Sequence, residues 1–414
     1  MKPTIILLFV LCRCYSFNIP NFIKSVQYPK LDIKKDTLSS TLAILIGLNV
    51  IAVDPVNALI APLAEVGIKE FLVKDGKQWL RLSQPVGKDV KLGSSRTSPE
   101  IEIQQNLELP RLRLEQVGTT NNPAWQKALG DITIAKSAIE SNKNLFIETA
   151  INKEKAKVKY EKIIKTLQEL ISVTKDKDAY KFFQLQDAAA NDFAELRALQ
   201  LPAKTLPFEI PQEYASLPVL AGRAKVEVIV DSKDGFSEEN GKKHKTEQFI
   251  IEVDGYHAPI TAGNFIDLVL SKYYDGMRTD NVQELIVQFG KDSKKPPRSI
   301  PLELFYRSDT EPTYSITSDD DQRATEAFAL PFQAFGALGM ARGVENPDSA
   351  EAEVFILKWR QALMPPGRNT LDGFYSCFGY IVSNNEMYWS QITTNDVIRS
   401  MKVISGSENL VKKT

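Results

Sequence analysis

The chain has 414 residues, with 51 lysines and arginines against 52 acidic residues, and it contains two histidines and three cysteines. A content of 43% hydrophobic and 25% charged residues is that of an ordinary soluble protein, which excludes a multi-span membrane protein or a disordered chain. A net charge of −1 excludes a broadly basic nucleic-acid-binding protein. With only His244 and His257, a multi-histidine metal site cannot form, and a Ser/His or Cys/His catalytic pair is disfavoured. At roughly 150 residues per domain, this length predicts two domains plus any processed leader.

The N-terminal region has the pattern of a leader with several parts. Residues 1–16 begin with one lysine before a short apolar core, which is typical of a secretory signal peptide. From Phe17 onward, a segment rich in lysine, serine and threonine but poor in acids is typical of a transit peptide. A second apolar run over 42–53 precedes Ala58, a small residue at the expected cleavage position. The alternative is that 42–53 forms a buried core helix.

This order resembles that of lumenal proteins from algal plastids enclosed by extra membranes. The resemblance implies a signal peptide over 1–16, followed by a plastid transit and thylakoid-transfer segment over 17–58. The processed chain then begins near Leu59 and is soluble in the thylakoid lumen. It retains one cysteine, Cys377, and therefore cannot form an intramolecular disulfide.

The first part of the processed chain has mixed signals. Residues 71–82 alternate between apolar and polar around Asp75-Gly76, which predicts a short hairpin. Residues 84–122 are rich in proline, glycine, serine and asparagine, which predicts mostly loop.

Residues 123–200 have helical periodicity. Apolar residues recur three and four positions apart in two successive segments: Ala156, Tyr160, Ile163, Leu167 and Leu170, then Phe182, Leu185, Ala189, Phe193 and Leu196. We therefore expect a helical-bundle domain over 59–205. Its charged face is either a docking surface or the solvated exterior of the bundle. The segment has no Glu-x-x-His pair, which excludes a metal-carrying bundle.

Prolines interrupt this pattern after residue 200 and predict a linker over 206–221. The period then changes to two over 224–230 and 248–253, which predicts two strands joined by the polar segment 231–245. A helix is expected at 261–269, and further strands at 284–289, 353–357 and 376–382. Many short strands with few helices predict a closed β-barrel, with a sandwich as the alternative.

Six short motifs follow one another along residues 222–414. They are 258–265 (Ala-Pro-Ile-Thr-Ala-Gly-Asn-Phe), 274–276 (Tyr-Asp-Gly), 286–290 (Ile-Val-Gln-Phe-Gly), 339–342 (Gly-Met-Ala-Arg), 354–355 (Val-Phe) and 371–379 (Leu-Asp-Gly-Phe-Tyr-Ser-Cys-Phe-Gly). This part therefore resembles the cyclophilins, peptidyl-prolyl isomerases built on an eight-stranded barrel. The Pro-rich junction is similar to that of the multidomain cyclophilins of the thylakoid lumen. The resemblance implies an N-terminal helical bundle followed by a cyclophilin-like closed eight-stranded β-barrel over 222–414.

Proline isomerisation requires rotation about an amide bond, which has a barrier of about 18–20 kcal/mol. A catalyst of this step needs an apolar pocket, donors for the flanking carbonyls and a cation near the prolyl nitrogen. The resemblance places the family's catalytic arginine on Asn281 or Asp280, neither of which is cationic, and Arg278 is the candidate substitute. Thr370 stands where the family has a tryptophan. The implied peptide-binding residues are Leu285, Ile286, Gln288, Ala341, Arg342, Glu353, Phe355, Leu371 and Tyr375.

The pocket is partly kept and the cation is lost, so we expect peptide binding with weak or absent isomerisation. The alternative is that these are ordinary residues on the barrel surface. The resemblance implies a lumenal immunophilin that acts in protein folding and in photosystem II assembly or maintenance. Its partners would be proline-containing segments of lumenal or thylakoid membrane proteins.

Two other functions stay open. One is an active isomerase in which Arg278 or Arg342 supplies the cation. The other is an extrinsic structural subunit of a photosynthetic complex that binds through the bundle. No cofactor, metal or nucleic acid is expected in any of these functions.

Overall fold

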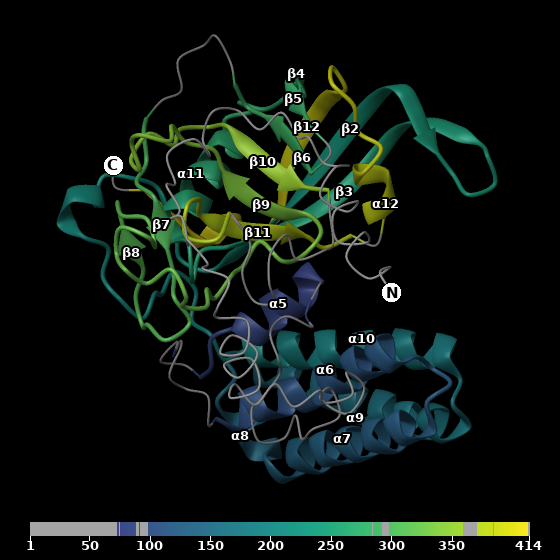
Figure 1. Ribbon diagram of the computed structural model, residues 1–414. Helices are drawn as coiled ribbons and strands as arrows, with labels where there is room; N and C mark the ends of the chain where they lie inside the picture. Colours follow the sequence, from purple (N-terminus) through teal and green to yellow (C-terminus); the bar gives the residue numbers. More distant parts are fainter. Residues whose placement is uncertain are drawn as a thin grey trace, which may run out of the picture. The chain divides into compact units, whose positions relative to one another are not determined.

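The computed structural model describes residues 73, 75–87, 91, 98–283, 285–291, 298–358, 371–383 and 385–412 (Figure 1). The expected leader over 1–58 lies outside these ranges. Within them, no helix is long and apolar enough to cross a membrane.

The N-terminal half of the described chain is helical, as the sequence predicts. Four long helices lie side by side in the bundle, with two short helices beside them (Figure 1). The helices are α5 (Gly76–Ser83), α6 (Pro99–Val117), α7 (Asn122–Ser141), α8 (Lys143–Glu148), α9 (Lys153–Asp176) and α10 (Ala179–Ala198). The predicted apolar positions of α9 and α10 are buried in one core, except for Leu185, which is half-buried against it. The helical periodicity is therefore confirmed.

Each long helix begins at a side-chain cap. Ser98, Asn121, Asn152 and Asp178 each accept a hydrogen bond from a backbone N–H in the first turn of the helix that follows. Such caps stabilise a helix by about 1 kcal/mol because the first four N–H groups have no partner within the helix.

The predicted hairpin over residues 71–82 is wrong, because most of that segment forms α5. Asp75 acts as the N-cap, with Oδ1 accepting from the N–H of Lys77 at 2.8 Å. Gly76 permits close packing, since a Cβ at that position would lie 2.3 Å from Cβ of Tyr380 in the sheet. The Asp-Gly pair therefore starts a helix that packs on distant residues, which the local alternation could not indicate.

The predicted loop over 84–122 is also wrong in large part, because α6 occupies 19 of those positions. Pro99 stands in the first turn, where a missing N–H costs nothing, but Pro110 lies inside the helix. Burial of Ile103, Leu107 and Leu114 in the bundle core compensates for the lost backbone hydrogen bond.

The C-terminal half is built on one nine-stranded antiparallel sheet, in the order β4-β12-β2-β3-β11-β9-β10-β6-β5 (Figure 1). In chain order these strands are β2 (Arg223–Ser237), β3 (Lys243–Asp254), β4 (Met277–Arg278), β5 (Asn281–Val282), β6 (Ile286–Phe289), β9 (Ala337–Met340), β10 (Val354–Leu357), β11 (Cys377–Ile381) and β12 (Val397–Ser405). Two further two-stranded sheets pair β1 (Val219–Leu220) with β13 (Leu410–Val411), and β7 (Glu303–Leu304) with β8 (Thr313–Tyr314). Helices α11 (Pro259–Leu270) and α12 (Glu386–Trp389) accompany them, with short 3₁₀ turns at Gln212–Tyr214 and Ser407–Asn409.

The predicted strands and the helix at 261–269 are confirmed, whereas the number of strands differs from the expected eight. The segment 231–245, expected as the connecting loop, is mostly strand, because β2 continues to Ser237 and β3 begins at Lys243. The two edge strands of the sheet, β4 and β5, are separated in the sequence only by Thr279 and Asp280. The sheet is therefore curled, because its two edge strands are joined by two residues. Within the described ranges no strand pairing joins these edges. A closed barrel therefore stays a prediction.

The core of the sheet follows from alternation along the strands. Val226, Val228 and Val230 of β2 are buried, while the residues between them are half-exposed. These side chains pack in one core with Phe265 and Ile266 of α11.

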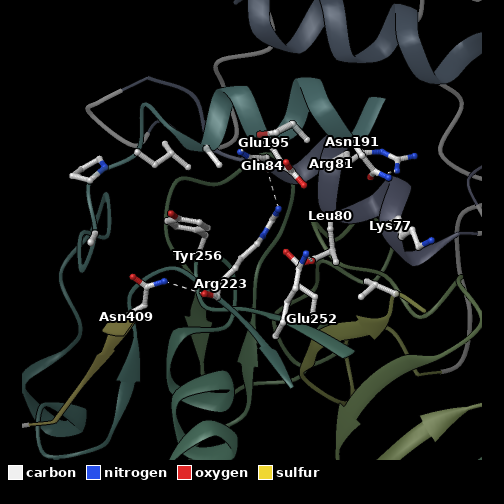
Figure 2. Close-up of a pocket in the computed structure, with 17 residues that line it drawn as sticks. Lys77, Leu80, Arg81, Gln84, Asn191, Glu195, Arg223, Glu252, Tyr256 and Asn409 are labelled. Atoms are coloured by element: carbon white, nitrogen blue, oxygen red, sulfur yellow. Dashed lines mark hydrogen bonds and ion pairs between the residues drawn. The ribbon is translucent and has the colours of Figure 1, made fainter. Parts of the chain in front are cut away.

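Arg223 links the sheet to the helical half. Its guanidinium pairs with Asp254 at 2.7 Å and donates to Oγ of Ser83, the last residue of α5, at 3.2 Å. It also donates to Oε1 of Gln84, which follows α5, at 3.3 Å (Figure 2). A cavity of about 500 Å³ surrounds this contact, where α5 and α10 approach β2 and β3. Trp79 and Leu80 of α5 also pack in a cluster with Tyr380 of β11.

Candidate functional site

A row of residues crosses five neighbouring strands of the large sheet. Asn281 of β5 pairs with Gln288 of β6, which pairs with Phe355 of β10. Phe355 pairs in turn with Gly339 of β9, which pairs with Cys377 of β11. Three of the positions singled out from the sequence therefore lie side by side.

Phe355 is the aromatic centre of this row. Its ring stacks on Phe332, with centroids 5.5 Å apart, and meets the edge of Tyr375 at 5.2 Å. A Cβ on Gly339 would lie 2.1 Å from Cζ of Phe355, so the ring rests directly on the backbone of β9. The ring is only 4% exposed and is held on three sides.

Polar side chains flank the aromatic centre in a hydrogen-bonded series. Nε2 of Gln283 donates to Oδ1 of Asn281 at 3.1 Å, and Nδ2 of Asn281 donates to Oε1 of Gln288 at 3.0 Å. Gln288 also bonds to Glu353. Burial raises the pKa of Glu353, the bond from Gln288 opposes that rise, and the negative charge of Asp280 adds to it. The polar side chains in this series are therefore neutral amides and carboxylic acids.

Arg342 lies at the edge of the site, where two of its three guanidinium nitrogens are engaged by backbone carbonyls. Nε donates to the carbonyl of Phe374 at 2.7 Å, and Nη1 donates to the carbonyls of Gly343 at 2.8 Å and Val344 at 3.2 Å. The guanidinium also lies 5.5 Å from the ring centroid of Tyr375. Arg342 therefore clamps two loops together and positions Tyr375 against Phe355.

The other sequence-derived positions fall into two groups. Ile286, Ala341, Leu371 and Tyr375 are partly buried and pack in the same cluster as Phe355. Leu285 lies half-buried just before β6, where its carbonyl accepts from the N–H of Lys358 at 2.8 Å. Thr370 lies outside the described residues.

The pairing register distinguishes the positions considered for the family's arginine. Asn281 is the residue that faces Gln288, whereas the side chain of Asp280 is exposed and only its backbone N–H reaches the Gln288 carbonyl, at 3.2 Å. Arg278 is exposed on β4, where its partner is Val397 of β12, at the opposite edge of the sheet order from β5. In the part of the chain that the structure describes, no arginine is paired with Gln288 across the strands.

Sequence reasoning missed two parts of the site. Phe332 stacks on Phe355 and is anchored by its N–H, which donates to Oδ1 of Asp372 at 2.8 Å. It comes from an irregular segment before β9 without any periodic signal. Gly339 occurs in a motif that the sequence analysis used, but its close contact with Phe355 depends on strand pairing.

His257 and Cys377 are both buried in the fold. His257 is buried, with Nδ1 3.3 Å from Oδ2 of Asp254. Cys377 is buried, and burial raises the pKa of its thiol above the ordinary value. Among the described residues, no group of three histidine, cysteine or acidic side chains is arranged to hold a metal ion.

Comparison with known proteins identifies the family of this region. Residues 241–404 match the family described as cyclophilin type peptidyl-prolyl cis-trans isomerase/CLD. A protein of Synechocystis named as a thylakoid lumen peptidyl-prolyl cis-trans isomerase is 36% identical over 260 residues, which are 60% of this chain and 64% of that protein.

Two chloroplastic peptidyl-prolyl cis-trans isomerases of Arabidopsis thaliana are similar as well. CYP38 is 38% identical over 49% of this chain and 47% of its own length. CYP37 is 34% identical over 59% of this chain and 52% of its own length. The chain thus spans less than two thirds of the length of each relative. The motifs and these matches identify residues 241–404 as a cyclophilin-type peptidyl-prolyl cis-trans isomerase domain.

Proposed function

We propose that this protein binds extended, proline-containing polypeptide segments at the site around Phe355 and catalyses their isomerisation weakly or not at all. The peptide-binding surface comprises Leu285, Ile286, Gln288, Ala341, Arg342, Glu353, Phe355, Leu371 and Tyr375. Aromatic and aliphatic side chains would hold the proline ring, and Gln288 would bind a peptide carbonyl.

The observation that carries this proposal is the pairing of Asn281 with Gln288. A guanidinium stabilises the twisted amide because its charge acts where the prolyl nitrogen lone pair develops. Asn281 offers only a neutral amide at this position, and that amide already donates to Gln288 at 3.0 Å. Arg342 does not substitute readily, because its Nε and Nη1 are bonded to three backbone carbonyls, which hold the guanidinium against the loops.

We further propose that the protein acts in the plastid thylakoid lumen after processing near Ala58. It would comprise a helical-bundle domain over 59–205, a linker over 206–221 and a cyclophilin-like closed barrel over 222–414. The names of the relatives, which are given as thylakoid-lumen or chloroplastic proteins, support this location. A part in folding and in photosystem II assembly or maintenance, through segments of lumenal or membrane proteins, is the role that fits such a location.

The proposal is tested by binding and catalysis measured on the same peptide. Titration of a fluorescent Ala-Pro peptide should show saturable binding that is weakened by Phe355→Ala. An isomerisation assay with that peptide should show little acceleration. Absence of binding would overturn the proposal, and efficient catalysis would overturn its second part.

A further inference from the structure

The cavity around Arg223 is lined by residues from both halves of the chain (Figure 2). One wall comes from α5, α10 and the segment that follows α10, and the other comes mainly from β2, β3 and Tyr256. Its volume of about 500 Å³ is in the range that holds small organic molecules. Within the described chain, no residue of the proposed peptide-binding surface contributes to its walls, so this cavity is separate from that surface.

Two cations of β2 line the cavity, and each forms a cross-strand ion pair with β3. Arg223 lies opposite Asp254, and Lys225 lies opposite Glu252. The first pair is buried and short, at 2.7 Å, whereas Nζ of Lys225 is 3.6 Å from Glu252 and the Lys225 side chain is 44% exposed. An ion pair of that length and exposure contributes little to stability. The Lys225 ammonium is therefore the cation that can turn to a ligand at low cost.

Tyr256, shortly after β3, offers a hydrogen-bond donor in the same wall. Its side chain is only 7% exposed, and its ring packs with Phe305 and Leu201. Burial raises the pKa of Tyr256 to about 12, so the hydroxyl stays protonated at neutral pH. Among the described residues, no group forms a hydrogen bond with this hydroxyl. Because buried polar groups are generally hydrogen-bonded, the Tyr256 hydroxyl suits an acceptor that enters the cavity.

Arg197 of α10 lies behind the cavity wall and has no carboxylate partner in the described chain. Its hydrogen bonds go to neutral oxygens, among them the carbonyls of Arg81 at 3.2 Å and Gln84 at 2.7 Å, and its Nε has no acceptor. Burial lowers the pKa of Arg197 to about 10, the charge of Glu100 opposes this, and the cation of Arg223 adds to it. Since Arg81 and Gln84 both line the cavity, a negative charge in it would offset the repulsion between Arg197 and Arg223.

We propose that this cavity binds a small organic anion, a carboxylate or a phosphate ester. Lys225 attracts the anionic group, and the hydroxyl of Tyr256 donates a hydrogen bond to the ligand. The rest of the ligand packs on apolar side chains of the walls, among them Leu80, Leu201 and Val382. The site is independent of peptide binding at Phe355, because the two share no lining residue.

The test measures binding of four probes to the full chain by saturation-transfer NMR. Benzoate and phenyl phosphate carry the two candidate anionic groups, benzamide is the neutral counterpart of benzoate, and benzylamine is the cationic one. At least one anion should bind saturably, and benzamide and benzylamine should bind at least threefold more weakly than it does. The affinity for the anion should fall at about 0.5 M salt, because the attraction by Lys225 is screened.

Two variants locate the binding. Lys225→Gln and Tyr256→Phe should each weaken binding of the anion by roughly threefold or more. Lys165→Gln on α9 and Tyr180→Phe on α10 make the same changes at exposed positions outside the cavity and should leave the affinity unchanged. Urea unfolding should show that Tyr256→Phe is as stable as the unmodified chain, since no protein contact of the hydroxyl is lost.

Three results would overturn this inference. The first is the absence of saturable binding by either anion at concentrations up to about 20 mM. The second is equal affinity for benzoate, benzamide and phenyl phosphate, which would show that charge is not recognised. The third is binding of the anion that neither Lys225→Gln nor Tyr256→Phe weakens, which would place the ligand elsewhere on the chain.

Discussion

Nδ2 of Asn281 donates to Oε1 of Gln288 at 3.0 Å across the pairing of β5 with β6. The bond fixes the orientation of the Gln288 amide and places a neutral group beside the site where a cation would assist isomerisation. Gln288 also interacts with Glu353, where it opposes the rise in the pKa of that carboxyl caused by burial. Peptide binding and catalysis can therefore be separated by substitutions in this row.

Gly339→Ala tests the support of the aromatic centre. The added Cβ would lie 2.1 Å from Cζ of Phe355, so the ring must move away from β9 and Phe332. We expect a loss of about 1–3 kcal/mol in the free energy of unfolding, measured with urea, and weaker peptide binding.

Gly130→Ala is the matched control for this substitution. Gly130 lies in the middle of α7 with no atom within 4 Å of an added Cβ, so the change should stabilise the protein by about 1 kcal/mol. The account of Phe355 fails if the two substitutions change stability in the same direction.

Arg223→Ala tests the link between the sheet and the helical half. The substitution leaves the fully buried Asp254 without its cation and removes the contacts to Gln84 and Ser83. We expect a loss of about 3 kcal/mol or more in the free energy of unfolding measured with urea, because removal of one partner leaves a buried charge without its counterion.

The exposed pair of Arg399 with Asp231 provides a comparison of similar geometry. Nε and Nη2 of that arginine both donate to the carboxylate, but its side chain is 54% exposed. Arg399→Ala should therefore cost less than about 1 kcal/mol. Equal losses for the two arginine variants would show that the Arg223 contact contributes nothing beyond a surface pair.

Glu303 predicts a pH dependence of stability. Its carboxylate is buried under the first turn of α11, where it accepts from the N–H groups of Ile260 at 3.2 Å and Thr261 at 2.9 Å. Burial raises the pKa of Glu303 to about 7, although these donors and Tyr314 oppose the rise. The folded state therefore holds a proton that the unfolded chain releases near its ordinary value of about 4.3.

The stabilising effect of this proton is complete at pH below about 4.3 and is lost as the pH rises through about 7. Urea unfolding between pH 4 and 8 should show a decline in stability of roughly 3 kcal/mol that Glu303→Gln abolishes. All other groups titrate alike in both proteins, so the difference between the two curves isolates Glu303. Parallel curves would mean that Glu303 has the same pKa in the folded and the unfolded chain.

The sequence predicts the helices with regular apolar spacing because their burial is periodic. Ala156, Tyr160, Ile163, Leu167 and Leu170 recur on one face of α9, and all five are buried as expected. The same holds for the alternating residues of β2, where a period of two matches the two faces of a sheet.

Features that depend on distant contacts could not be predicted. The pair Asp75-Gly76 has the local pattern of a hairpin, yet it begins α5 because Gly76 packs against Tyr380, more than 300 residues later. The sequence also left the position of the family's arginine open between Asp280 and Asn281. Strand register places Asn281 opposite Gln288, and register is set by pairing between β5 and β6 rather than by either segment alone.

The most direct test of the central claim compares the full chain with its Asn281→Arg variant in one proline-isomerisation assay, at peptide concentrations where both bind. We predict little acceleration by the unmodified chain and an increase of roughly tenfold or more in the variant, because the guanidinium is placed opposite Gln288. Arg278→Ala should leave the rate of the unmodified chain unchanged. Efficient isomerisation by the unmodified chain that is lost in Arg278→Ala or Arg342→Ala would contradict the account.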